Sequence, residues 1–167
     1  MKPSFVHLRV HSEYSLIDGV VRIKELAAAV VEKGMPAVAI TDAANLFGLV
    51  KFYKAASSAG IKPIVACDIW VAAEKENEDP TPLVLIAKNE TGYRNLSELL
   101  SKAFNEGQVR GRATLRKDWI RAQSEGLLAL SAGKDGDVGK ALLSGNPETA
   151  EVLAQEWLSI FQGDFYL

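Results

Sequence analysis

The sequence FVHLRVHSEYSLIDG, residues 5–19, contains the pattern on which the fold prediction depends. Apolar and polar residues alternate over its first seven positions, and this period of two is typical of a strand with one polar face. The polar face carries both histidines of the chain, His7 and His11, with Arg9 between them. Serine, glutamate and aspartate side chains follow and favour a loop. Because α/β proteins build sites at the carboxyl ends of strands, we expect a site in this loop.

Two helix-strand units follow this first strand. Residues 22–33 have apolar side chains at helical spacing and are followed by Gly34, which is typical of a helix end. The wholly apolar run at 37–40 then predicts a strand that is covered on both faces. The pattern repeats with a helix over 45–58 and a strand over 63–71. This repetition indicates βαβ units, and therefore parallel strands with right-handed crossovers.

The second half of the chain predicts two further strands and four helices. An acidic stretch at 74–81 is expected to be an exposed loop. Residues 104–114 are expected to form a loose connection, and residues 163–167 a turn that leads into a strand. The strands are expected at 83–87 and 127–130, and the helices at 91–103, 116–123, 138–143 and 147–161. The whole chain, residues 1–167, therefore predicts an α/β fold with about five strands.

Length and composition indicate one globular domain. The chain has 167 residues, of which 48% are hydrophobic and 24% charged, and this is ordinary for a folded domain. No apolar run approaches the ~20 residues of a membrane span, and the amino terminus leads directly into a strand without a signal-peptide core. Cys67 is the single cysteine, so no disulfide can form within the chain. We expect a cytoplasmic protein without a membrane partner.

The charge of the chain argues against direct binding of nucleic acid. The formal net charge is −2, whereas phosphate binding needs a clustered excess of lysine and arginine. One basic cluster exists and consists of Arg110, Arg112, Arg116, Lys117 and Arg121. We predict that it is a solvated face, and that the nearby aromatic residues Phe104 and Trp119 belong to the core.

Polar residues stand where each predicted strand ends. These residues are His11 with Asp18, Thr41 with Asp42, Cys67 with Asp68, Lys88 with Asn89, and Ser131. In a parallel sheet such ends face the same way, so three carboxylates and a histidine could converge as in a divalent-metal site. Each residue alone also has a structural explanation. Asp18 suits a turn, Asp42 could cap a helix, and Cys67 could be a small buried hydrophobe.

Three stretches carry a family resemblance that covers essentially the whole chain. They read FVHLRVHSEYSLIDG, MPAVAITDAANLFGLVKFYKAASSAGIKPIVACDIWV and LVLIAKNETGYRNLSELLSKAF. Together they closely resemble the amino-terminal PHP domain (polymerase and histidinol phosphatase) of bacterial DNA polymerase III alpha subunits. The resemblance implies an irregular (β/α)7 barrel, truncated here after about five strands. It also implies that the last strands, with their Asp-x-His motif, lie beyond Leu167.

The chain departs from the metal-binding pattern of this family. Members with an intact metal centre have histidine at the positions of Arg9, Ala43 and Pro82, cysteine at the position of Gly133, and in many cases glutamate at the position of Asp68. The ligands that the resemblance retains are His11, Asp18, Asp42 and Asp68. Four of the expected ligands are thus replaced by residues whose side chains cannot coordinate a cation. The resemblance therefore implies a vestigial metal site with no catalytic residue and no metal, or, if any metal survives, one that is held by the four retained ligands.

Arg9 suggests what replaced the metal. A guanidinium keeps its positive charge at any accessible pH, so it can offset the mutual repulsion of nearby carboxylates. We hypothesise that Arg9 does this for Asp18, Asp42 and Asp68. With only two histidines in the chain, a histidine-rich hydrolytic site cannot be assembled.

The resemblance implies a noncatalytic module. Such a domain packs against the remaining domains of the alpha subunit and serves as the docking platform for the separate proofreading exonuclease subunit. The parent subunit is a DNA-directed DNA polymerase, a nucleotidyltransferase that uses Mg²⁺, and its chemistry lies in later domains; no cofactor is expected for this portion. The alternative is a metal-dependent phosphoesterase that acts on pyrophosphate or on 3′ ends, which needs a metal-bound water.

Overall fold

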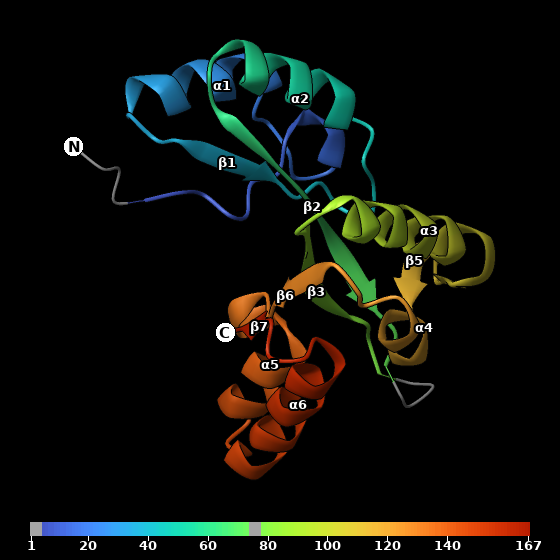
Figure 1. Cartoon of the computed structure of the whole chain (residues 1–167). Helices are drawn as coiled ribbons and strands as arrows, with labels where there is room; N and C mark the ends of the chain where they lie inside the picture. Colours follow the sequence, from blue (N-terminus) through green and yellow to red (C-terminus); the bar gives the residue numbers. More distant parts are fainter. Residues whose placement is uncertain (1–4, 74–77) are drawn as a thin grey trace. The chain divides into compact units, whose positions relative to one another are not determined.

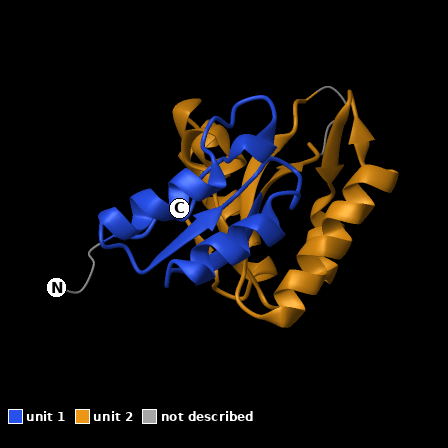
Figure 2. Cartoon of the chain, turned by 90° about the horizontal axis from the view of Figure 1, so that it is seen from above, with its two compact units in different colours: residues 1–67 blue, residues 68–167 orange. Residues whose placement is uncertain are grey.

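The computed structural model describes residues 5–73 and 78–167. The chain forms two compact units, residues 1–67 and residues 68–167, which Figure 2 colours separately. Part of the acidic loop expected at 74–81 lies outside the described residues. In the described part, no helix is both long enough and apolar enough to cross a membrane.

The first unit contains two helix-strand pairs. Helix α1 (Ile23–Glu32) precedes strand β1 (Ala37–Ile40), and helix α2 (Leu49–Ser58) precedes strand β2 (Lys62–Val71), whose first residues belong to this unit. Strands β1 and β2 are parallel, with Ala37 opposite Lys62 and Ile40 opposite Val65. The two helices lie side by side (Figure 1). This arrangement confirms the predicted βαβ unit.

Apolar residues at helical spacing bury one face of each helix in this unit. Helix α1 buries Ile23, Ala27 and Val30, and helix α2 buries Phe52 and Ala56. Together with residues of β1 they form a core that consists of Ile23, Val30, Val38, Ile40, Phe52, Ala56 and Ile61. Each of these side chains is removed from water, which stabilises the unit by roughly 1.5–3 kcal/mol for a large aliphatic or aromatic residue.

Helix α2 begins later than the predicted residue 45. The side-chain oxygen of Asn45 accepts a hydrogen bond from the backbone N–H of Phe47 at 3.0 Å, and its amide donates to the carbonyl of Tyr14 at 3.0 Å. Asparagine commonly forms such a local turn, which competes with helix formation. The helix therefore starts only at Leu49.

Residues 5–11 lie alongside β1 and form hydrogen bonds with it, but they do not form the regular strand that was predicted. The backbone N–H of Ala39 donates to the carbonyl of His7 at 2.9 Å, and that of Thr41 donates to the carbonyl of Val10 at 2.8 Å. Between these two hydrogen bonds the chain advances by two residues on the β1 side, from Ala39 to Thr41, and by three on the other side, from His7 to Val10. The extra residue interrupts the regular pattern of hydrogen bonds between the two segments. The N–H of Val10 instead donates to the Thr41 hydroxyl at 3.1 Å. The alternating pattern indicated extended backbone correctly but could not reveal this extra residue.

The second unit contains a mixed sheet with helices. Its further elements are β3 (Thr81–Ala87), α3 (Glu90–Glu106), β4 (Gln108–Val109), β5 (Arg112–Leu115), α4 (Lys117–Ala122), β6 (Leu127–Leu130), α5 (Asp137–Leu143), α6 (Pro147–Ile160) and β7 (Phe165–Tyr166). Among the described residues the strand order is β4-β5-β2-β3-β6-β7, and β1 also pairs with β2. Counting β1, which belongs to the first unit, the described residues contain seven strands. The predicted α/β class is confirmed, and so is the short strand expected near residue 165.

Two features of this unit differ from the sequence prediction. The loose connection expected at 104–114 contains an antiparallel hairpin, in which Gln108 pairs with Ala113 and Val109 pairs with Arg112. Strands β3 and β6 are antiparallel, with Ala87 opposite Leu127. Hydrophobic periodicity reports burial and not strand direction, so it could not distinguish an antiparallel neighbour from a parallel one.

Candidate functional site

The first loop of the chain is held by the carboxylate of Asp42. This residue follows β1, and only 1% of its surface is exposed. Its Oδ1 atom accepts hydrogen bonds from the backbone N–H of Ser12 at 2.6 Å and from the Ser15 hydroxyl at 3.0 Å, and its Oδ2 atom accepts from the Ser12 hydroxyl at 2.7 Å. A buried carboxylate is costly unless its oxygens are hydrogen-bonded, and here both oxygens are.

Ser12 and Ser15 were not predicted as site residues. Both are buried, and the Ser15 hydroxyl also accepts a hydrogen bond from the backbone N–H of Ala43 at 3.2 Å. The two serines are the first and fourth residues after His11. At this spacing both hydroxyls reach the carboxylate of Asp42. The sequence signal was present, but serine in a loop is so common that it indicates no particular partner.

His11 and Asp18 lie in contact at the surface of the first unit. The His11 Nδ1 atom and the Asp18 Oδ2 atom are 2.9 Å apart, with side-chain exposures of 22% and 57%. A carboxylate at one ring nitrogen selects the tautomer and leaves the other nitrogen to a second partner. The predicted neighbourhood of these two residues is thus observed. Arg9, two residues earlier, is exposed.

Glu13 and Lys51 form a second charged contact beside this loop. The Lys51 ammonium donates to Glu13 Oε1 at 2.9 Å and lies 5.4 Å from the centre of the Tyr14 ring. The hydrogen bond from Lys51 holds the pKa of the Glu13 carboxyl below its ordinary value, and the same bond raises the pKa of Lys51. The pair ties the loop to helix α2.

Cys67 is a buried structural residue. It has no exposed surface, and its Sγ atom donates to the carbonyl oxygens of Asp42 at 3.1 Å and Asn45 at 3.6 Å. This environment agrees with the interpretation as a small buried hydrophobe with a weak donor.

The second unit holds the other predicted positions. Asp68 is 5% exposed at the point where β2 enters this unit. Pro82 is buried and is the second residue of β3, whereas the sequence analysis expected that strand to begin at residue 83. Gly133 follows β6 and has a φ of +60°. Because β3 and β6 are antiparallel, Pro82 and Gly133 lie at the same end of this strand pair.

The same strand pairing corrects one prediction about the site. Lys88 and Asn89 follow the carboxyl end of β3, and Ser131 follows the carboxyl end of β6. Those ends face opposite ways in an antiparallel pair, so the two groups do not converge. Asn89 instead caps helix α3, where its side chain accepts from the N–H of Gly92 at 3.0 Å.

Candidate metal-ligand side chains are not clustered within the described residues of either unit. Within the described residues of either unit, no three side chains of histidine, cysteine, aspartate or glutamate are grouped as a cation would need. Both carboxylate oxygens of Asp42 already accept hydrogen bonds from hydroxyl and backbone N–H donors. The first loop is therefore organised by hydrogen bonds to a carboxylate.

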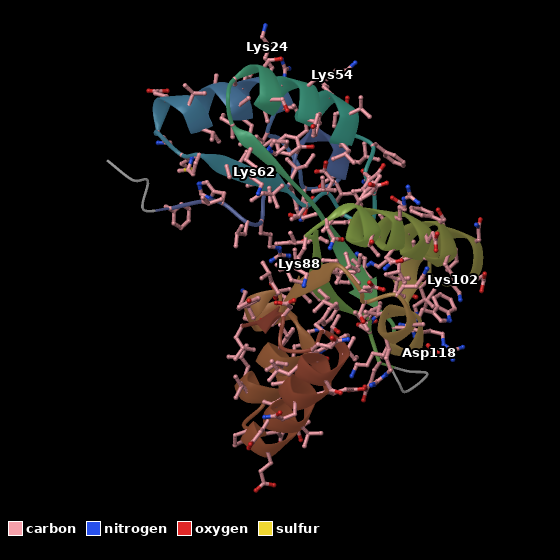
Figure 3. All side chains as sticks on the ribbon, in the orientation of Figure 1. Lys24, Lys54, Lys62, Lys88, Lys102 and Asp118 are labelled. Atoms are coloured by element: carbon pink, nitrogen blue, oxygen red, sulfur yellow. The ribbon has the colours of Figure 1, made fainter. Side chains whose placement is uncertain are left out.

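The basic cluster of the second unit is mostly paired with acids. Arg110 contacts Asp79 at 3.2 Å, and Arg116 contacts Asp118 through two hydrogen bonds, of 3.0 and 2.8 Å. Lys117 and Arg121 both contact Glu156, at 2.6 and 3.3 Å. Figure 3 shows Lys102 on α3 and Asp118 on α4 in this part of the unit. Such pairing agrees with a solvated face rather than a track for phosphates.

The aromatic residues near this cluster are less buried than predicted. Phe104 is 47% exposed, and Trp119 is half-buried with the Lys102 ammonium 4.5 Å from its ring centre. The prediction that both residues belong to the core was wrong. Phe104 lies on the outer side of α3, whose buried residues include Leu99 and Ala103. Helical spacing located the helix correctly but not the edges of its buried face.

Comparisons with known proteins identify the family. A family model described as the PHP domain matches residues 7–167. The chain is 52% identical over 167 residues to DNA polymerase III subunit alpha of Pseudomonas aeruginosa and 45% identical over 164 residues to that of Escherichia coli K12. It covers only 14% of the length of each of these relatives.

A crystal structure from Bifidobacterium adolescentis has the same fold. That protein, whose proposed activity is that of a metal-dependent phosphoesterase, superimposes with a TM-score of 0.56 over 96% of this chain and 85% of its own chain. The two sequences are 11% identical, so the likeness concerns the fold alone. Since the family match spans nearly all of the sequence, the chain belongs to the PHP domain family.

Proposed function

We propose that this chain is the amino-terminal PHP domain of a DNA polymerase III alpha subunit and acts there as a noncatalytic module. The observation that carries the proposal is the identity of 52% and 45% to two alpha subunits over nearly the whole chain. In this proposal nucleotidyl transfer and its Mg²⁺ ions belong to later domains of the polypeptide. The chain itself contributes no residue to that reaction.

The metal site of the family is degenerate in this proposal. Arg9, Ala43, Pro82 and Gly133 stand where metal-binding members have ligands, and Arg9 adds a permanent positive charge in place of one of them. The hydrogen bonds that Asp42 accepts from Ser12 and Ser15 support this, because hydroxyl and N–H donors already occupy both oxygens of this carboxylate. Tight, stoichiometric binding of Zn²⁺ or Mn²⁺ in calorimetry, abolished by Asp42→Asn, would contradict it.

The module serves as the docking platform for the proofreading exonuclease subunit. The test is gel filtration of the full-length alpha subunit and of residues 1–167, each mixed with the exonuclease subunit. We expect both to co-elute with the exonuclease. Failure of residues 1–167 to bind, with circular dichroism showing a folded chain, would exclude docking by this portion. Primer extension by the full-length subunit separately tests whether the polypeptide is a polymerase.

One observation favours the alternative of a metal-dependent phosphoesterase. The contact between His11 and Asp18 is the kind of imidazole-carboxylate pair that orients metal ligands. The assays follow release of phosphate from pyrophosphate, and release of mononucleotides from the 3′ end of an oligonucleotide as a 3′-5′ exonuclease would give, with Mn²⁺ or Zn²⁺ and after chelation. The proposal predicts no metal-dependent release. Turnover that is lost in His11→Ala would establish the alternative instead.

A further inference from the structure

We draw no further inference here: the strongest candidate, the exposed apolar surface patch that Leu16, Ile17 and Val20 form in the first loop of the chain, carries nothing, because nothing in the described part of the structure shows what covers it.

Discussion

Asp42 shows how a buried carboxylate can have a structural role. It is buried, and the donors that reach it are hydroxyls and a backbone N–H from the loop that follows the first extended segment. Hydrogen bonds to a buried ionised group are stronger than hydrogen bonds between two neutral groups. A buried donor that loses its acceptor lowers the free energy of unfolding. The loop conformation therefore depends on the charge state and acceptor capacity of this one residue.

Replacing Asp42 by asparagine should destabilise the fold. The amide nitrogen cannot accept a hydrogen bond, so one donor of Ser12 or Ser15 would lose its partner at a cost of about 1–3 kcal/mol. Urea-induced unfolding followed by circular dichroism measures the change. Asp118→Asn is the control, because Asp118 is exposed and pairs only with Arg116 among the contacts seen here; it should alter the free energy of unfolding by less than about 0.5 kcal/mol. Equal effects of the two substitutions would contradict the role of Asp42.

The ion pair of Glu13 and Lys51 should be visible in a titration. The hydrogen bond from Lys51 lowers the pKa of Glu13 from the ordinary 4.5. A lowered folded-state pKa contributes stability above the unfolded-state pKa, and that contribution is lost as the pH falls through the folded value. NMR titration of the Glu13 carboxyl carbon should give a midpoint below 4.5 that returns toward 4.5 in Lys51→Met. A midpoint that Lys51→Met leaves unchanged would mean that the pair does not form in solution.

Among the elements, periodicity predicted those in which burial follows a simple repeat. Helix α1 and strand β1 lie where the apolar spacing predicted them. The helix buries one stripe of side chains, and the strand buries the side chains on both of its faces, so each shows a clear hydrophobic pattern. The hairpin of β4 and β5 was missed since β4 has only two residues, both exposed, and its turn uses Arg110 and Gly111 at positive φ. No repeat of hydrophobicity can arise in two exposed residues.

Helix α3 offers a test of packing at the scale of an element. A Cβ atom on Gly92 would lie 1.9 Å from the carbonyl oxygen of Gly126, in the backbone that leads into β6. Alanine normally favours a helix over glycine by about 0.8–1.0 kcal/mol, but the clash here should reverse the sign. We expect Gly92→Ala to lower the free energy of unfolding by about 1–3 kcal/mol.

Ser101→Ala in the same helix is the matched control. Ser101 is exposed, and its hydroxyl donates to the carbonyl of Ser97 at 2.9 Å. This variant should stay within about 0.5 kcal/mol of the parent chain. A stabilised Gly92→Ala variant would show that α3 and the segment around Gly126 are not in contact.

For the whole molecule, the sequence predicted the family and the fold class but only part of the candidate site. His11 and Asp18 were predicted to be neighbours and are in contact. The residues that bind Asp42 were missed, because Ser12 and Ser15 acquire their role only when β1 brings Asp42 beneath the loop. The expected convergence of Asn89 with Ser131 was wrong, because it assumed that all strands run the same way.

Metal affinity should be low in this chain and recoverable by substitution. Isothermal titration with Zn²⁺ and Mn²⁺ should detect no tight, stoichiometric binding to the parent chain. The double variant Arg9→His, Ala43→His places imidazole at two positions of the first unit where the resemblance implies family ligands, and we expect it to bind Zn²⁺ at least tenfold more tightly, a gain of about 1.4 kcal/mol. Its control carries histidine at Lys24 and Lys54, two exposed lysines of the same unit that project from the helices in Figure 3. Equal affinities of the two double variants would mean that His11, Asp18 and Asp42 do not form the frame of a metal site.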